Sequence, residues 1–148
     1  MKAFVLHTGE ASMTVFIEGR YQGAKKVALC HAESGVTIET AAPKDNGGDG
    51  SSFSPTDLVA AAVGSCMVTI MGLMAERDGS SLAGTWFTVE KHMSASPRRI
   101  ARLPVVIHLP KQLTPAERTK LERGAHTCPV AHSLHPDVKV EVTFCYDV

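Results

Sequence analysis

The stretch SPTDLVAAAVGSCMVTIMGLMAERDG, residues 54–79, predicts the longest helix of the chain. Ser54 suits the N-cap position, Pro55 suits the first helical position, and Asp57 adds an acidic side chain to the first turn. We expect the helix to end near Asp78, where charged residues and a glycine follow one another.

Most of this helix carries no charge. Residues 58–75 are uncharged, and this run reaches the lower length limit for a membrane span, about 18 residues. The run is rich in Ala and Gly and contains Ser and Thr, so it is only moderately hydrophobic. A helix that is apolar on every side is also typical of a protein core. Because the flanking segments alternate like soluble strands, we expect a buried core helix and no membrane partner.

Length and charge limit the class of protein. The 148 residues predict one domain, 1–148, with a sizeable core. Fifteen basic and fifteen acidic residues cancel, so no basic surface argues for a nucleic acid or an anionic membrane as partner. The N-terminus lacks a long apolar segment followed by a cleavage site, and we therefore expect a cytoplasmic protein.

Short strands and turns are expected on both sides of the helix. The part before it, residues 1–53, contains β-branched or alternating runs and a glycine-rich loop. These strands are expected at 13–18, 25–31 and 36–40, with a turn at 34–35 and the loop at 44–52. The part after it, residues 54–148 with the helix included, contains alternating runs as well. These are expected at 85–93, 103–109 and 138–146, with a basic turn, SASPRRIAR, at 94–102.

A second helix follows the strand at 103–109. Thr114 as N-cap, Pro115 at the first helical position and Glu117 at the third form a capping-box pattern. This helix is expected to continue to about Thr127, and Cys128-Pro129 then begins a short helix. Strands, a central helix, more strands, a second helix and a final strand together predict an α+β fold.

The chain contains four cysteines: Cys30, Cys66, Cys128 and Cys145. In an intracellular chain of this size, such cysteines are more often buried, metal-binding or catalytic than paired in a disulfide framework. Cys30 and Cys145 lie on predicted strands without a neighbouring feature that would activate a thiol. Cys145 falls on the polar face of the last strand. We interpret both as structural residues.

Cys66 and Cys128 remain open from local sequence. Cys66 lies midway along the central helix, where a buried, inert thiol is the ordinary interpretation. The preceding Gly64 and Ser65 leave the helix surface thin, which could let a molecule approach the sulfur. Cys128 precedes a proline and is expected at an N-cap, where the helix dipole favours a thiolate, and a protonated His126 could add to this effect.

A metal site is the alternative for the second of these cysteines. His126, Cys128, His132 and His135 form the pattern H-x-C-x3-H-x2-H. Imidazole and thiolate are ligands that zinc prefers, and Cys128 and His132 would share one face of a short helix. The cluster lacks a tight CxxC or HxxxH spacing, so we expect no metal here.

Two of these motifs together resemble the OsmC/Ohr family of thiol-dependent hydroperoxide reductases. SPxDLVAAA at 54–62 leads into GSC at 64–66, and CPV at 128–130 precedes a short helix and a final strand. The resemblance covers most of the chain. It implies an OsmC-like fold, in which curved antiparallel sheets surround two central helices in an intertwined homodimer with active sites at the subunit interface.

The resemblance also implies a chemistry. Cys66 would be the peroxidatic cysteine, reducing alkyl or lipid hydroperoxides in oxidative stress defence. Cys128 would be the resolving cysteine that closes a Cys66–Cys128 disulfide, and an external dithiol would then reduce it. No cofactor and no metal is expected, because sulfur carries the reaction. This assignment reverses the local argument, in which Cys128 was the better activated thiol.

The activating residues of the family are where this chain departs from the pattern. Family enzymes pair an arginine from the N-terminal strands with a glutamate at the start of the central helix. Here Thr56 takes the place of the glutamate, and Asp57 is the nearest carboxylate. Arg20 is the positional candidate for the arginine. Arg98 and Arg99 of the basic turn are substitutes that a partner subunit could supply.

Two other classes of function stay open at this point. The departure at Thr56 and Asp57 is compatible with a non-catalytic OsmC-fold protein that binds an apolar or electrophilic small molecule near Cys66. A protein that binds metal through His126, Cys128 and His132 is the third hypothesis. Peroxide consumption, a retained ligand and bound metal would distinguish the three.

Overall fold

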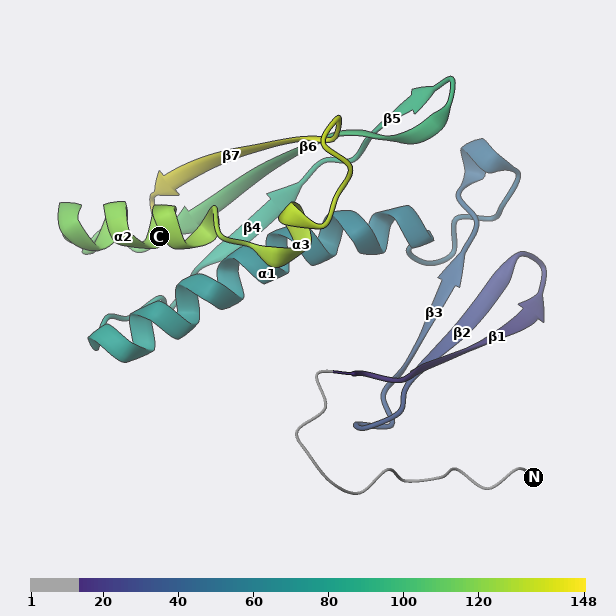
Figure 1. Cartoon of the computed structure of the whole chain (residues 1–148), viewed down its shortest axis with the longest axis horizontal. Helices are drawn as coiled ribbons and strands as arrows, with labels where there is room; N and C mark the ends of the chain where they lie inside the picture. The colour runs from purple at the N-terminus through teal and green to yellow at the C-terminus, as the bar shows by residue number, and fades with distance from the viewer. Residues whose placement is uncertain (1–13) are drawn as a thin grey trace. The chain divides into compact units, whose positions relative to one another are not determined.

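The computed structural model describes residues 14–148. These residues divide into two compact units, of which one ends at Ser54 and the other begins at Pro55 (Figure 1). The division lies one residue from the internal boundary expected between 1–53 and 54–148. That the two units form one domain stays a prediction.

The first unit is a three-stranded antiparallel sheet in the order β1-β2-β3. Its elements are β1 (Ile17–Gly23), β2 (Lys26–His31), β3 (Thr37–Ala41) and the 3-10 turn η1 (Lys44–Asn46). The β1–β2 turn places Ala24 and Lys25 at φ 50° and 62°, a left-handed pair that suits the twist of a tight hairpin. The β2–β3 turn uses Gly35 at φ 70°, as the sequence indicated.

The first strand lies later than its sequence pattern indicated. The pattern favoured 13–18, whereas β1 runs from Ile17 to Gly23, and Met13 lies outside the described residues. The register explains the difference, because Ile17 pairs with His31 and Gly23 with Lys26 across the tight turn. Turn geometry therefore set the pairing more strongly than the β-branched run did.

The second unit packs three helices and a four-stranded sheet. The helices are α1 (Pro55–Asp78), α2 (Pro115–Ala125) and α3 (Pro129–His132), and the strands are β4 (Trp86–Val89), β5 (His92–Ala95), β6 (Arg98–Leu109) and β7 (Lys139–Tyr146). The long strand β6 pairs with the other three. The single strand expected at 85–93 is split into β4 and β5 by Glu90 and Lys91. The turn between β5 and β6 is only Ser96-Pro97.

The last strand joins the sheet in parallel. β7 pairs with β6 from Arg102↔Lys139 to Leu109↔Tyr146 in parallel register, while β4 and β5 are antiparallel to β6. The α+β fold is confirmed, but this second sheet is mixed rather than purely antiparallel. The reason is the connection, because the chain crosses over through α2 and α3 before β7, and a parallel pair requires such a crossover.

The helix ends follow the capping signals. Thr114 accepts a hydrogen bond from the Glu117 N–H and the Glu117 side chain accepts one from the Thr114 N–H, so the expected capping box is present. The second helix ends at Ala125, two residues before the expected limit, and α3 begins with Pro129 after Cys128. The α1 bounds agree with the sequence prediction.

The core lies between the helices and one face of the sheet. One side of α1 is buried, through Ala60, Val63, Gly64, Met67, Met71 and Ala75. The facing side chains of β6 are Leu103, Val105, Ile107 and Leu109, each no more than 1% exposed. By length and composition α1 could cross a membrane, a test that the core helix of a soluble protein also passes. The buried stripe favours the core interpretation.

Candidate active site

Cys66 lies midway along α1 and is half-buried. The structural role of Gly64 differs from the thin helix surface that the sequence indicated. A Cβ at Gly64 would lie 2.3 Å from the Phe87 ring, so glycine is needed for β4 to pack against α1. The space over Gly64 is therefore filled by Phe87.

Cys128 is the N-cap of α3, as its place before Pro129 predicted. Its sulfur accepts a hydrogen bond from the Ala131 N–H at 3.4 Å. The same sulfur donates toward the Val63 carbonyl oxygen of α1 at 3.9 Å. The side chain is fully buried. Cys128 is thus held between the first turn of α3 and the turn of α1 that leads to Cys66.

The pKa of Cys128 reflects both its burial and the neighbouring Cys66 thiol. Burial raises the pKa of Cys128 above its ordinary value, while the Ala131 N–H lowers it. The neighbouring Cys66 thiol raises the pKa of Cys128 further. The N-cap was therefore predicted correctly, but burial outweighs the helix N-terminus, so the expected thiolate is not favoured at Cys128.

Neighbouring thiols can be oxidised to a disulfide if their backbones lie close enough. Cys66 and Cys128 are 62 positions apart in sequence by their numbers, and the docking of α3 on α1 brings them together. All four cysteines are free thiols in this structure.

The histidines around Cys128 do not form the metal cluster that their spacing suggested. The His132 ring faces the His126 carbonyl oxygen at 3.1 Å, and the His126 ring packs edge-on against Phe144 at 6.0 Å. The His135 ring accepts from the Asp137 N–H. Within residues 14–148, the three potential ligands that do meet are a different group, from β6 and the end of the chain.

Asp57 forms an ion pair with Lys91, which sequence reasoning missed. The Lys91 Nζ atom lies 2.5 Å from the Asp57 carboxylate and 2.9 Å from the Thr56 hydroxyl. The Lys91 side chain is only 17% exposed. Lys91 lies at the break between β4 and β5, and the only available signal was a lysine within an otherwise continuous strand pattern.

The position of Asp57 along α1 limits what it can do. Cys66 lies nine positions after Asp57 by their numbers, and a helix rises about 1.5 Å per residue, which gives roughly 13 Å. A direct contact between the carboxylate and the sulfur is excluded by this rise. Asp57 could act on Cys66 only through a cation that it holds.

The candidate arginines Arg20 and Arg99 lie on strands of different units. Arg20 lies on β1 in the first unit, pairs with Glu18 and is 79% exposed. Arg99 lies within β6 instead of in a turn, because β6 begins at Arg98. Arg99 donates to Asp137 at 2.8 Å. Its place near the thiols stays a prediction, as does that of Arg20.

The pairing with Arg99 lowers the pKa of Asp137. The hydrogen bond from Arg99 holds the pKa of Asp137 below its ordinary value, and the charges of His135 and Arg99 lower it further. Within one chain Arg99 therefore stabilises the loop between α3 and β7.

The chain belongs to the OsmC-like family. The OsmC-like protein family model matches residues 48–143, which include both motifs and both thiols of the interacting pair. No curated protein matches the chain by sequence.

Solved structures agree with this assignment. A candidate osmotic stress induced and detoxification response protein from Psychrobacter arcticus 273-4 is 37% identical, with a TM-score of 0.83 over 94% of this chain and 99% of that one. An organic hydroperoxide resistance protein OsmC from Legionella pneumophila is 23% identical, with a TM-score of 0.69 over 92% and 99%. OhrB of Bacillus subtilis, an organic hydroperoxide resistance protein, is 19% identical, with a TM-score of 0.62 over 89% and 98%. The last two show the fold alone.

Proposed function

We propose that this protein is a thiol-dependent peroxidase that reduces organic hydroperoxides in the cytoplasm as a defence against oxidative stress. Cys66 is the peroxidatic residue and Cys128 the resolving residue. The observation that carries the proposal is the position of Cys128, whose sulfur lies against the Val63 carbonyl one turn before Cys66. Membership of the OsmC-like family and structural neighbours named for organic hydroperoxide resistance support it.

The environments of the sulfurs support this division of roles. Cys66 is half-buried, whereas Cys128 is fully buried and holds its proton through a raised pKa. The thiolate is the nucleophilic form of cysteine. A hydroperoxide therefore meets Cys66 first, and Cys128 reacts only with a sulfur that is already beside it.

The proposed reaction has three balanced steps. The Cys66 thiolate attacks the terminal oxygen of ROOH, the O–O bond breaks, and Cys66 becomes a sulfenic acid while the alkoxide takes a proton and leaves as ROH. The Cys128 thiol then attacks the sulfenic sulfur, forming the disulfide and releasing water. An external dithiol reduces the disulfide by exchange and is itself oxidised to a disulfide.

The functional unit is proposed to be a homodimer. α1 is apolar on all sides, yet only one side is buried, and Leu73 on another side is 51% exposed. The first unit also exposes large apolar side chains, namely Val15, Phe16, Ile17, Tyr21, Val36 and Ile38. Exposed apolar surface of this kind marks protein interfaces. In the dimer Arg20, Asp57 and Arg99 are proposed as positioning residues that could activate Cys66.

Mass spectrometry of the fully reduced protein tests the proposal. One equivalent of tert-butyl hydroperoxide should remove two hydrogens from the protein within one turnover, and peptide mapping should assign them to a Cys66–Cys128 bridge. The Cys30→Ser variant is the matched control, because Cys30 lies on β2 in the first unit, and it should form the same bridge. Unmodified thiols after this treatment would refute the peroxidase proposal.

One observation favours a second candidate function. Asp57 is paired with a lysine instead of an arginine, which departs from the arginine–carboxylate pair implied by the family resemblance. An OsmC-fold protein that binds an electrophilic small molecule at Cys66 would have this structure as well. It would retain a ligand on purification and leave tert-butyl hydroperoxide unreacted.

A further inference from the structure

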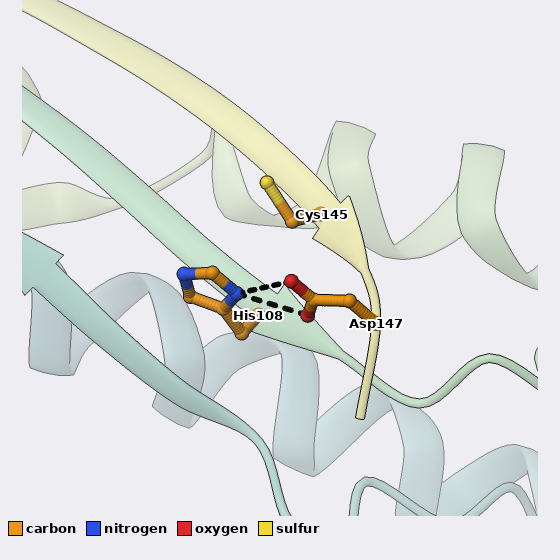
Figure 2. A group of neighbouring side chains, drawn as sticks. All are labelled: His108, Cys145 and Asp147. Carbon is orange, nitrogen blue, oxygen red and sulfur yellow. Dashed lines mark hydrogen bonds and ion pairs between the residues drawn. The ribbon is translucent and has the colours of Figure 1, made fainter.

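His108, Cys145 and Asp147 form a cluster at one end of the sheet of the second unit, which we call the His108 cluster (Figure 2). A ring nitrogen, a sulfur and a carboxylate oxygen, one from each residue, all lie within 4.8 Å of one another. Within the described part of the chain, no other group of three such side chains meets this way. The cluster shares no residue with the thiol pair.

Strand pairing places the cluster on a rigid surface. His108 of β6 is directly opposite Cys145 of β7 in the parallel register. Asp147 follows Cys145 by two positions, and its N–H donates to the Leu109 carbonyl, so its side chain points to the same face. The neighbouring Ile107 and Leu109 point the other way, into the core. The His108 cluster therefore lies on the sheet face opposite the helices.

Two of the three candidate metal ligands, His108 and Asp147, are already in contact. The His108 Nδ1 atom lies 2.9 and 2.8 Å from the two Asp147 carboxylate oxygens (Figure 2). A tetrahedral zinc ion bound by nitrogen, oxygen and sulfur at about 2.0–2.3 Å has ligand–ligand separations of roughly 3.5 Å. The separations in the cluster, from 2.8 to at most 4.8 Å, bracket this value. Small side-chain rotations are enough to reach it.

Trp86 restrains the imidazole. Its ring stacks on His108 with centroids 3.9 Å apart and an interplanar angle of 1°, because the two residues are paired across β4 and β6. A metal ion binds in the plane of an imidazole, so Trp86 covers a ring face and leaves the nitrogen edges accessible. A restrained ligand loses less side-chain entropy when it binds.

We propose that His108, Cys145 and Asp147 bind a divalent transition-metal ion of the zinc class. Thiolate, imidazole and carboxylate are the ligands that zinc takes, and three protein ligands leave a fourth position for water or an external ligand. The imidazole presents Nδ1 with its proton on Nε2, and the Cys145 thiol proton leaves to water when the ion binds. Half of the Asp147 side chain is exposed, which provides an entry path.

The competing explanation is an ordinary ion pair. A His108–Asp147 pair accounts for two of the three side chains, and Cys145 would then be an unrelated strand residue. A bound cation would explain why all three side chains lie together and why they lie on one face of the sheet. The proposal is independent of the peroxidase function, because it involves neither Cys66 nor Cys128.

Titration with Co²⁺ alone tests the proposal. Reduced, chelator-treated full-length protein should bind one equivalent and develop a thiolate-to-cobalt charge-transfer absorption. Cys145→Ser should abolish this absorption, and Asp147→Asn should weaken binding by about tenfold or more. Cys30→Ser should bind as the wild type does. In a second measurement, Zn²⁺ should slow the alkylation of Cys145, mapped by peptide, and leave that of Cys30 unchanged.

The outcomes separate the explanations. An absorption that persists in Cys145→Ser would show that another thiol binds the metal and would overturn the proposal, as would the absence of binding at tenfold excess. Asp147 lies beyond β7 and is half-exposed, so Asp147→Asn should fold even if Cys145→Ser does not. Peroxide consumption should be unchanged in Cys145→Ser, which keeps this test distinct from that of the peroxidase.

Discussion

The sulfur of Cys128 lies 3.9 Å from the carbonyl oxygen of Val63, one helical turn before Cys66. This contact holds the N-terminus of α3 against the middle of α1 and places two thiols from distant parts of the chain near each other. It also explains why Cys128 keeps its proton, since the contact buries the sulfur. This position suits a thiol that reacts only after a neighbouring sulfur has been oxidised.

Replacing Cys66 and replacing Cys128 should therefore have different effects on the reduction of peroxide. Cys66→Ser should abolish the consumption of tert-butyl hydroperoxide, because no other thiol takes its place. Cys128→Ser should allow one turnover and leave Cys66 as a sulfenic acid that excess peroxide oxidises to sulfinic acid. Intact-mass spectra should show the added oxygens on the Cys66 peptide alone. Equal oxidation of both variants would contradict the assigned roles.

Stability should fall in alkaline solution because of Cys128. Its folded-state pKa is raised above the ordinary 9.0, so above pH 9.0 the folded chain holds a proton that the unfolded chain has lost. The free energy of unfolding should be insensitive to this group below pH 9.0. It should then decrease by up to about 1.4 kcal/mol per pH unit until the folded-state pKa is passed.

Urea unfolding at several pH values between about 8 and 10 measures this slope. The Cys128→Ala variant should lose it, whereas Cys30→Ala should retain it. Burial and the Glu122 hydrogen bond also raise the pKa of Tyr146, whose ordinary value is 10.0, so Tyr146 contributes near the upper end of this range, equally in the wild type and in Cys128→Ala. An identical slope in the wild type and Cys128→Ala would show that the Cys128 pKa is not raised.

The packing of β4 on α1 should depend on Gly64. An alanine there would place its Cβ 2.3 Å from the Phe87 ring, so Gly64→Ala should lower the free energy of unfolding by about 1–3 kcal/mol. Gly72 is the control, because a Cβ there meets nothing within 4 Å. Gly72→Ala should stabilise the protein by roughly 0.5–1 kcal/mol. Chemical denaturation at equal protein concentration checks both, and effects of the same sign would refute this account.

The Asp57–Lys91 pair should matter more than a surface pair of the same length. Lys91→Gln should cost about 1–2 kcal/mol, since this ion pair is intermediate between exposed and buried pairs. Lys120 pairs with Asp78 at the same distance, 2.5 Å, but is 54% exposed, and Lys120→Gln should cost less than about 0.5 kcal/mol. Thermal unfolding measures both costs, and a larger loss for Lys120→Gln would contradict the burial argument.

The dimer should depend on the uncovered side of α1. Light scattering should give twice the mass of one chain, and Leu73→Lys should shift the protein toward the monomer, because a charge at this apolar position opposes burial. Thr88→Lys introduces the same charge on the sheet face away from the helices and should leave the mass unchanged. A wild-type protein that is monomeric at all concentrations tested would rule out the dimer.

Local signals predicted the helices well. Ser54-Pro55 located the start of α1, and Thr114, Pro115 and Glu117 located the start of α2, because caps are formed by residues close in sequence. The N-cap at Cys128 was predicted for the same reason. The β7 alternation correctly placed Cys145 on the polar face of its strand.

Contacts between distant segments could not be predicted in this way. The thiol pair followed only from a family resemblance, since nothing near Cys66 points to Cys128. Lys91 and the His108 cluster were missed because their partners are far away in sequence. Cys145 was interpreted as structural for this reason. The β1 register depends on a tight turn at Ala24 that the β-branched run before it did not reveal.

The parallel pairing of β7 with β6 has a kinetic consequence. The β1–β2 hairpin joins neighbours in sequence, but Arg102 pairs with Lys139 only after the chain has crossed over through α2 and α3. Closing so long a loop is entropically slow compared with forming a hairpin. The same crossover carries Cys128. We therefore expect the β1–β2 hairpin to form before the long-range pairing that brings Cys66 and Cys128 near each other.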